Sequence, residues 1–529
     1  MMSSSDKKMS VTIASHFFKV LVKTPEDFAL VTKFAKKFTH IETDKQGGPQ
    51  VTIYAVISNV DNEFRFHINA FDSFKNFLNA CGFNDNYYEL IILPTNYGKT
   101  VKLAMHDKFV PRPVQVPIIE YFLTKQSESG VCKGQILKQN FIGIQTGEGK
   151  TLTSSFCAVK LGKRILICVR PLFMKKWAKD IFEIYKVKKN ETLSVQGSDQ
   201  LKGLISIAKT KEFNNVKIIL VSLPTMRNWI KAYETFGKQK TKELGYGCDP
   251  DEFYEYLGVG LRLIDEVHID FHFNFIHDLF TNVNKSISLS ATLMSLDPFM
   301  ERMYSIAYPK SDRYNGGELK KYTRSFAVLY DFYENRRIRT SEYGSNQYSH
   351  FAFEKSIMNK QNTGLLINYC GLIYDVLSIK FLPTFKKGNK AVVYAASKKM
   401  CTEIANFLKK ELPDYDVRRY IGSDPKDPGP EDPYENLIDS DIRVTTIQSG
   451  GTGHDIPGLT DVVMTNCIQS IQQNIQVLGR LREIPDGETR FYYLTCFTLK
   501  KQMKYHFEKM EMLKQRAKSF EILPYGIKL

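Results

Sequence analysis

The chain has 529 residues, of which 43% are hydrophobic and 25% are charged, so it is long enough and apolar enough for two to four globular domains. Lysine and arginine exceed aspartate and glutamate by 73 − 57 = 16, and this charge favours either a polyanionic partner such as nucleic acid or a generally basic, well-solvated surface. Nine scattered cysteines without a C-x-x-C pair disfavour a zinc ribbon and a thioredoxin-type site, and they suit a reducing cytoplasm.

The beginning of the chain, MMSSSDKKMS, is polar and charged, and no apolar segment resembling a signal peptide follows it. No apolar run reaches the roughly 18 residues that a membrane-spanning helix needs. We therefore expect a frayed N-terminus, no membrane partner and a cytoplasmic location.

Residues 1–105 predict a small α+β domain. Strands are predicted by four runs rich in β-branched and aromatic residues, at 17–23, 50–58, 63–69 and 87–93. A helix is predicted by the spacing of Phe71, Phe74, Phe77 and Leu78, with Gly82 as its stop. Basic residues such as Lys36, Lys37 and Lys75 make this domain either a candidate for gripping duplex DNA at a branch or only a packing platform.

From residue 106 onward, short apolar strands alternate with helical stretches, which predicts parallel sheets covered by helices on both faces. Two series of such strands occur, at 164–169, 216–222, 261–266 and 286–292, and then at 391–397, 441–447, 461–466 and 490–495. We therefore predict two α/β domains in tandem, 106–310 and 311–498, followed by a basic helix and tail over 499–529. Residues 233–257 and 422–436 are predicted as loops.

The segment IQTGEGKT, residues 144–151, continues the apolar run NFIGI and precedes a predicted helix. It lacks only the first glycine of the pattern G-x-x-x-x-G-K-[ST]. Gly147 and Gly149 would let backbone N–H groups turn toward phosphates at the helix N-terminus. Lys150 would reach the β- and γ-phosphates, and the Thr151 hydroxyl would hold Mg²⁺. The alternative is a glycine-rich turn without a ligand.

Asp265 and Glu266 end the apolar strand LRLI and are followed by Val267 and His268. Open α/β sheets place ligand chemistry at the carboxyl ends of their strands. Asp265 would hold Mg²⁺ through its water shell, and Glu266 would orient or deprotonate an attacking water. The alternative is two acids in a surface turn beside a packed histidine.

The segment QVLGRLR, residues 476–482, supplies Arg480 and Arg482. A guanidinium that approaches from another domain can neutralise the charge that develops on a γ-phosphate. By itself, the same segment could be a solvated helix start or a contact with a phosphate backbone.

These segments resemble, in the correct order from Arg112 to Arg482, the motif series of superfamily 2 helicases and translocases. The matches are Arg112-Pro-Val-Gln115 for the Q motif, IQTGEGKT for motif I, RPLFMKKW (170–177) for motif Ia, IDEVH for motif II, Ser290-Ala291-Thr292 for motif III, VVYAAS (392–397) for motif IV, TTIQSGGTGHDIPGLTDVV (445–463) for motif V and QVLGRLR for motif VI. Two departures are Lys176, where motif Ia commonly has glutamine, and Arg482, which lies one position earlier than the family's last arginine.

The resemblance implies two tandem RecA-like motor domains that use ATP and Mg²⁺, with catalysis by Lys150, Asp265, Glu266, Arg480 and Arg482. Arg480 stands at the family's arginine position, and Arg482 is a substitute. It implies nucleotide contacts for Arg112, Gln115, Thr146, Gly147, Glu148, Gly149, Lys150, Thr151, Gly453 and Asp455. It implies coupling roles for His268, Ser290, Thr292 and Gln476. It implies nucleic-acid backbone contacts, or else only solvated polar residues, at Arg170, Pro171, Thr225, Ser397 and Thr446.

The N-terminal pattern F-x-x-F-x-x-F-L-x-x-x-G-F (71–83) is similar to that of phage recombination and branch-migration helicases of the UvsW group. This likeness implies 3′→5′ movement on DNA and action on forks and Holliday junctions in recombination, replication or repair, within the host cytoplasm. The alternatives are an RNA helicase, a double-strand translocase that does not unwind, and a non-catalytic scaffold. Intact Lys150, Asp265 and Glu266 disfavour the scaffold.

Overall fold

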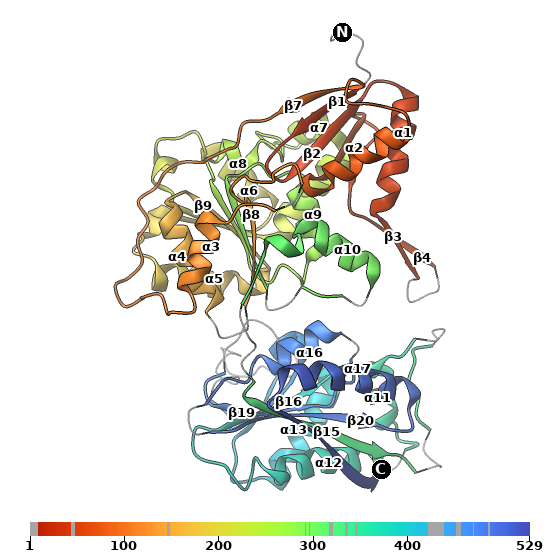
Figure 1. Ribbon diagram of the computed structural model, residues 1–529. Coiled ribbons are helices and arrows are strands. Elements are labelled where there is room, and N and C mark those ends of the chain that lie inside the picture. The colour runs from red at the N-terminus through yellow and green to blue at the C-terminus, as the bar shows by residue number, and fades with distance from the viewer. Residues whose placement is uncertain are drawn as a thin grey trace. The chain divides into compact units, whose positions relative to one another are not determined.

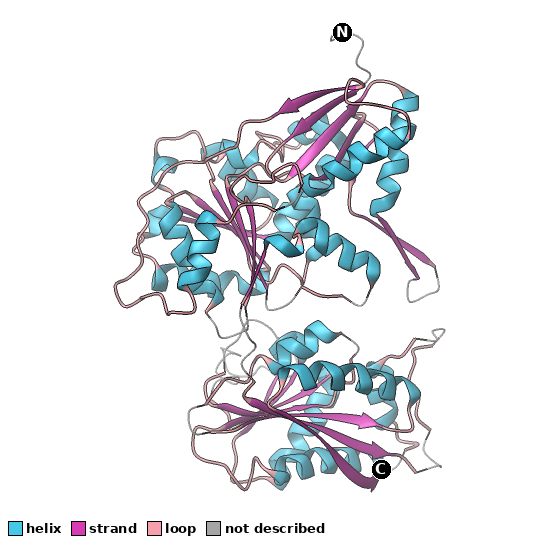
Figure 2. Cartoon of the chain, in the orientation of Figure 1, coloured by secondary structure: helices cyan, strands magenta, loops and turns pink. Residues whose placement is uncertain are grey.

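The structure is a computed structural model that describes residues 9–43, 48–128, 130–144, 149–290, 293–295, 297–316, 321–333, 337–343, 347–362, 364–421, 439–450, 456–468, 470–484 and 487–529. The chain divides into two compact units, one of Met1–Glu42 with Pro49–Gly316 and one of Thr43–Gly48 with Gly317–Leu529. Helices flank the parallel sheet within each unit (Figure 2).

The first unit begins with a five-stranded sheet in the order β5-β6-β2-β1-β7, in which β1 and β7 are parallel and the other neighbours antiparallel. Its strands are β1 (Met9–Ile13), β2 (Phe17–Val22), β5 (Val56–Ser58), β6 (Glu63–His67) and β7 (Tyr88–Ile92). Helices α1 (Pro25–Ala35) and α2 (Phe71–Ala80) cover one face of this sheet (Figure 1). The ring of Phe34 from α1 lies 5.0 Å from that of Phe66 and 5.2 Å from that of Phe74. The predicted helix and α+β composition are therefore confirmed.

Two N-terminal predictions were wrong in detail. Strand β1 starts at Met9, inside the stretch that was predicted to fray, because it pairs with both β2 and β7. Residues 50–58 form two strands rather than one, since β4 (Pro49–Ile53) pairs with β3 (Thr39–Thr43) in a separate ribbon, whereas β5 joins the main sheet. Between β4 and β5, Tyr54 is buried against Phe275 and Phe299, which separates the two strands.

Each unit contains a seven-stranded sheet whose described neighbours are all parallel. The orders are β10-β11-β9-β12-β13-β8-β14 and β17-β18-β16-β19-β20-β15-β21. When the strands of each sheet are numbered along the chain, both orders become 3-4-2-5-6-1-7, so the two sheets share one topology. The chain has two tandem RecA-like domains.

The strands of the first of these sheets are β8 (Gln139–Gly143), β9 (Ile165–Val169), β10 (Thr192–Val195), β11 (Ile218–Ser222), β12 (Leu261–Ile264), β13 (Lys285–Ser290) and β14 (Arg313–Asn315). Its helices are α3 (Val116–Thr124), α4 (Lys150–Leu161), α5 (Pro171–Ile184), α6 (Ser198–Ile207), α7 (Leu223–Glu243), α8 (Phe253–Tyr256), α9 (Phe271–Asp278) and α10 (Pro298–Ala307). Side chains of α3, α4 and α5 pack on one face of the sheet. On the other face, Leu166 and Ile219 belong to the same hydrophobic cluster as Phe18 and Phe66, so the N-terminal sheet and the RecA-like sheet share one core.

The second unit has strands β15 (Thr323–Asp331), β16 (Lys390–Ala395), β17 (Val417–Tyr420), β18 (Ile442–Thr446), β19 (Leu459–Met464), β20 (Thr489–Cys496) and β21 (Ser519–Lys528). Its helices are α11 (His350–Ile357), α12 (Leu365–Ile379), α13 (Lys398–Glu411), α15 (Ile447–Gly450), α16 (Ile471–Leu478) and α17 (Lys500–Arg516). Helices α12 and α13 pack on one face of the sheet and α16 and α17 on the other (Figure 1). The predicted basic helix is α17, and the segment after it supplies the edge strand β21.

Candidate nucleotide and nucleic-acid site

Most of the predicted residues in the first unit lie at one edge of its parallel sheet. Arg170 follows β9, Asp265 follows β12, and Ser290 is the last residue of β13. The strands β9, β12, β13 and β8 are consecutive, parallel neighbours, and α4 starts at Lys150 after β8. This edge is where the carboxyl ends of parallel strands meet and where open α/β sheets bind ligands.

The backbone conformation at the start of α4 favours glycine at Gly149, and two predicted side chains lie close to this residue. Its φ of +81° lies in the left-handed region, and a Cβ atom there would come within 2.7 Å of Arg112 Nη2 and 2.8 Å of Gln115 Nε2. The same distances show that both predicted Q-motif residues lie against Gly149. The predicted phosphate-loop residues Thr146, Gly147 and Glu148 lie outside the described residues.

Gln115 is buried and makes three hydrogen bonds around the start of α4. Its Nε2 donates to Gly149 O at 3.3 Å and to Thr153 Oγ1 at 3.1 Å, while its Oε1 accepts from Arg112 N at 3.0 Å. Gln115 thus ties Arg112 to the first turn of α4. Its contact with an adenine base stays a prediction.

Lys150 and the acidic pair approach each other at the sheet edge. Lys150 Nζ lies 3.3 Å from Glu266 Oε1, and the lysine is 9% exposed. Glu266 adopts a φ of +49°, an uncommon conformation for a residue with a side chain. Burial raises the pKa of Asp265, the neighbouring Glu266 raises it further, and Lys150 lowers it. A cation beside these acids therefore stabilises their charged forms.

Asp265 accepts hydrogen bonds at both carboxylate oxygens. Its Oδ1 accepts from Glu266 N at 3.0 Å, and its Oδ2 accepts from the indole Nε1 of Trp177 in α5 at 3.1 Å. A carboxylate and the Thr151 hydroxyl are oxygen donors of the kind that Mg²⁺ prefers, so these predicted ligands fit the ion chemically. Trp177 was not predicted as a functional residue, since its partner lies 88 positions away in the chain.

His268 links the segment after β12 to the end of β13. Its Nδ1 is hydrogen-bonded to Ser290 Oγ at 2.8 Å and lies 3.5 Å from Glu266 Oε2. Burial lowers the pKa of His268 to about 4, so the ring is neutral at pH 7 and this link does not depend on a histidine charge. Two predicted coupling residues are thereby in direct contact, whereas Thr292 lies outside the described residues.

The predicted nucleic-acid residues of the first unit are engaged in contacts within the protein. Arg170 donates to both carboxylate oxygens of Asp270, from Nε at 2.5 Å and from Nη2 at 3.0 Å, and Pro171 is the first residue of α5. Thr225 is buried, and its Oγ1 accepts from Gly197 N at 2.7 Å. Their contact with nucleic acid stays a prediction.

In the second unit, Ser397 and Thr446 lie at the carboxyl ends of the neighbouring strands β16 and β18. Ser397 Oγ caps α13 by accepting from Met400 N, and Thr446 Oγ1 donates to Ser449 Oγ at 3.0 Å. Gln476 and Arg480 are 8% and 7% exposed, respectively, and Arg482 Nη1 donates to Gly479 O at 2.7 Å. Gly453 and Asp455 lie outside the described residues.

Glu354 of α11 holds the backbone at the end of β16. Its two carboxylate oxygens accept from Ala396 N and Ser397 N, each at 2.7 Å, and the side chain is fully buried. The segment around Glu354 gave no sequence signal for such a role. Glu354 therefore positions the predicted nucleic-acid contact Ser397.

We expect this buried acid to make the stability of the second unit depend on pH. Burial raises the pKa of Glu354 to about 7 from its ordinary 4.5. The folded state therefore binds a proton at Glu354 more tightly than the unfolded state does. This stabilisation is fully present below pH 4.5 and is lost as the pH rises through 7. The expected loss in the free energy of unfolding is about 3 kcal/mol. His350, with its Nε2 3.9 Å from Glu354, stays neutral because burial lowers its pKa to about 3.

Urea unfolding followed by circular dichroism at pH 5.0 and 7.5 measures most of this difference. Glu354→Gln should abolish most of it, because the amide does not titrate, and Glu411→Gln at the exposed end of α13 should preserve it. An equal dependence of stability on pH in the wild type and in Glu354→Gln would contradict the assignment of this dependence to Glu354.

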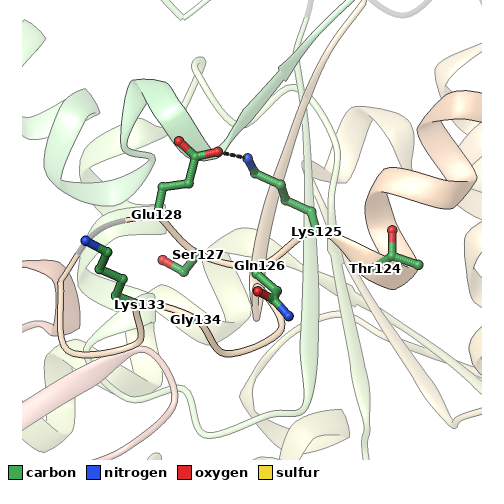
Figure 3. A pocket seen from close by; sticks show the side chains of 7 residues that line it. All are labelled: Thr124, Lys125, Gln126, Ser127, Glu128, Lys133 and Gly134. Atoms are coloured by element: carbon green, nitrogen blue, oxygen red, sulfur yellow. Dashed lines mark hydrogen bonds and ion pairs between the residues drawn. The ribbon is translucent and has the colours of Figure 1, made fainter.

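Two other features of the first unit lie apart from these residues. His40, Glu42 and Asp297 are close enough to share a metal ion, but His40 directs Nδ1 toward Glu42 and Nε2 toward Asp297, so the ring bridges two carboxylates. A polar hollow of about 720 Å³ lies beside the loop after α3 (Figure 3). It is lined by residues between 124 and 134, none of which was predicted as a site residue. Among the described residues, no helix has the length and apolarity needed to cross a bilayer.

No known protein-family profile matches the chain. The transcript termination protein A18 of Fowlpox virus (strain NVSL) is 25% identical to it over 443 residues, which cover 80% of this chain and 84% of the viral protein. The likeness thus extends over most of both proteins.

Three solved structures resemble the chain. They are the Hef helicase domain of Pyrococcus furiosus (TM-score 0.42, 13% identity, covering 75% of this chain and 98% of that one), Mss116p bound to ssRNA and AMP-PNP (0.46, 15%, 78% and 74%), and a fragment of a putative HsdR subunit of a type I restriction enzyme from Vibrio vulnificus YJ016 (0.47, 15%, 96% and 87%). At these identities and TM-scores the similarity carries no information about activity or substrate.

Proposed function

We propose that the chain is an ATP-dependent motor that moves along nucleic acid. The observation that carries this proposal is the approach of Lys150 Nζ to Glu266 Oε1 at 3.3 Å, beside Asp265, at the carboxyl edge of a parallel sheet. The sequence around Lys150 matches a phosphate-binding loop, and the match supports ATP as the substrate. The second RecA-like domain supports a two-domain motor rather than a simple nucleotide-binding protein.

In the proposed reaction, Lys150 binds the β- and γ-phosphates and Glu266 accepts a proton from the attacking water. The water oxygen bonds to the γ-phosphorus as the bond to the β–γ bridging oxygen breaks, which leaves ADP and phosphate. Mg²⁺, when bound, neutralises phosphate charge, and Thr151 and Asp265 are the residues that would hold it. Arg480 and Arg482 belong to the second unit, and their role as arginine finger stays a prediction.

Within the first unit, the hydrogen bond between His268 and Ser290 supports a path from the hydrolytic site to the segment after β13. A change at Glu266 on loss of the γ-phosphate would reach His268 directly, because the two side chains lie 3.5 Å apart. We propose that this contact converts the state of the nucleotide into movement of the nucleic-acid-binding surface.

For the track, we propose DNA moved in the 3′→5′ direction, with branched DNA as the preferred form. The support is the likeness of the motif series and of the N-terminal pattern to phage branch-migration helicases. The name of the viral relative refers instead to transcript termination, which makes RNA the second candidate track.

The test is ATP hydrolysis by the wild type with single-stranded DNA, forked DNA, a four-way junction, duplex DNA and single-stranded RNA at matched nucleotide concentrations. We expect the fork and junction to stimulate hydrolysis most and rising salt to weaken the stimulation steeply. If RNA stimulates hydrolysis more than every DNA does, RNA is the track instead of DNA. Absence of ATP hydrolysis with every nucleic acid would contradict the motor itself.

A further inference from the structure

Helix α5 is tied to the segment after β12 at two points. At its N-terminus, Arg170 forms a paired contact with Asp270 at 2.5 and 3.0 Å. Two turns further along, Trp177 Nε1 donates to Asp265 Oδ2 at 3.1 Å. Because both ties join the same two segments, α5 and the acidic pair are held in a fixed relation to each other.

Trp177 is well placed to hold Asp265 in one orientation. It is 2% exposed, and it shares the buried face of α5 with Phe173, Met174, Ile181 and Ile184. This packing fixes the indole ring, and the ring fixes Oδ2 while Glu266 N fixes Oδ1. A carboxylate held at both oxygens is pre-oriented for a ligand.

The other tryptophan of the chain provides a natural comparison. Trp229 of α7 is also fully buried, and its ring stacks on Tyr246 at 5.3 Å. Its Nε1 has no hydrogen-bond partner among the described residues. The two tryptophans therefore share burial and differ in whether the indole N–H contacts the acidic pair.

We propose that Trp177 is a positioning residue that couples α5 to the ATP site by orienting Asp265. The inference rests on the proposed function, because it takes Asp265 to hold Mg²⁺ during ATP hydrolysis. It adds a route by which nucleic acid bound at the N-terminus of α5, as predicted for Arg170 and Pro171, would alter hydrolysis through the contact of Trp177 with Asp265.

The test compares Trp177→Phe with the matched control Trp229→Phe in the full chain. Trp177→Phe keeps an aromatic ring and removes the N–H, so we expect about a tenfold rise in the Mg²⁺ concentration for half-maximal ATP hydrolysis and about a tenfold loss of nucleic-acid stimulation. Trp229→Phe should match the wild type in both. If the wild type is active and Trp177→Phe has the same Mg²⁺ dependence and the same stimulation by nucleic acid, the inference is overturned. The proposed motor function is then unaffected.

Tryptophan emission supplies a readout that needs no turnover. In Trp229→Phe only Trp177 emits, and its emission should change when Mg²⁺ and ADP are added. In Trp177→Phe only Trp229 emits, and its signal should stay constant. An unresponsive Trp177 would overturn the inference without requiring Trp177→Phe to fold. If neither the wild type nor Lys150→Ala hydrolyses ATP, the proposed function fails instead.

Discussion

Replacing Lys150 with alanine is expected to lower nucleic-acid-stimulated ATP hydrolysis by about 10²–10³-fold. Lys150 is the positive charge beside Glu266 Oε1, at 3.3 Å, and it lies at the first position of α4, where phosphates would meet the helix N-terminus. Its removal deletes a phosphate contact and leaves Asp265 and Glu266 without their nearest cation. Nucleotide affinity should therefore fall together with the turnover number.

The matched control for this variant is Lys160→Ala, which removes an exposed lysine from the last turn of the same helix. Both variants change the net charge by the same amount, so a difference between them reports position rather than charge. Hydrolysis is measured with saturating forked DNA, and nucleotide affinity is measured with a fluorescent ATP analogue. If Lys150→Ala and the wild type both hydrolyse ATP equally poorly, a scaffold role gains support, and if both hydrolyse it equally well, the chain does not depend on Lys150.

The placement of the residues proposed for hydrolysis could be predicted because Asp265 and Glu266 directly follow a short apolar strand and Lys150 begins the helix after another. Asp265 comes after the buried run LRLI, and strands β9, β12 and β13 were all expected from composition alone. Parallel strands end at a common edge, so the sequence order of strand and polar residue was enough to bring Lys150 and Glu266 together. In the structure the two side chains are in contact although they lie 116 positions apart.

Contacts that depend on packing between distant segments could not be predicted in this way. The bond from Trp177 to Asp265 and the bonds from Glu354 to the end of β16 join segments with no shared local pattern. Thr225 shows the reverse case, because the resemblance implied a nucleic-acid contact or a solvated polar residue there, yet its Oγ1 is buried and accepts from Gly197 N. The local sequence predicts where a strand ends. It does not predict which distant residue each side chain at that end will bond to.

The strands that were missed are mostly short or at an edge, such as β10, β14 and β17. Such strands gain their hydrogen bonds from a neighbour, so their own composition carries little signal. The predicted loop over 233–257 was wrong for another reason. Within Leu223–Glu243 the chain is helical on both sides of a kink at Gly237, whose φ of +74° is not helical. Buried Tyr233 and Thr241 hold the parts of α7 on both sides of that kink.

Glu266→Gln should separate nucleotide binding from hydrolysis. The amide keeps the size of the side chain and an oxygen that Lys150 Nζ can still donate to, so the positive φ of residue 266 and the contact at 3.3 Å need not change. It removes the carboxylate that would accept a proton from water, so we expect the turnover number to fall by about 10²–10⁴-fold. Affinity for ATP should stay close to that of the wild type.

This pattern is distinct from that of Lys150→Ala, in which both affinity and turnover decline. Equilibrium binding of ATP and single-turnover hydrolysis measure the two quantities separately, and Glu243→Gln at the exposed end of α7 controls for loss of a surface charge. If Glu266→Gln turned over ATP normally while Lys150→Ala did not, water would be activated by another group. The neutral His268, hydrogen-bonded to Ser290, would then be the candidate to test next, because its Nδ1 lies 3.5 Å from Glu266 Oε2.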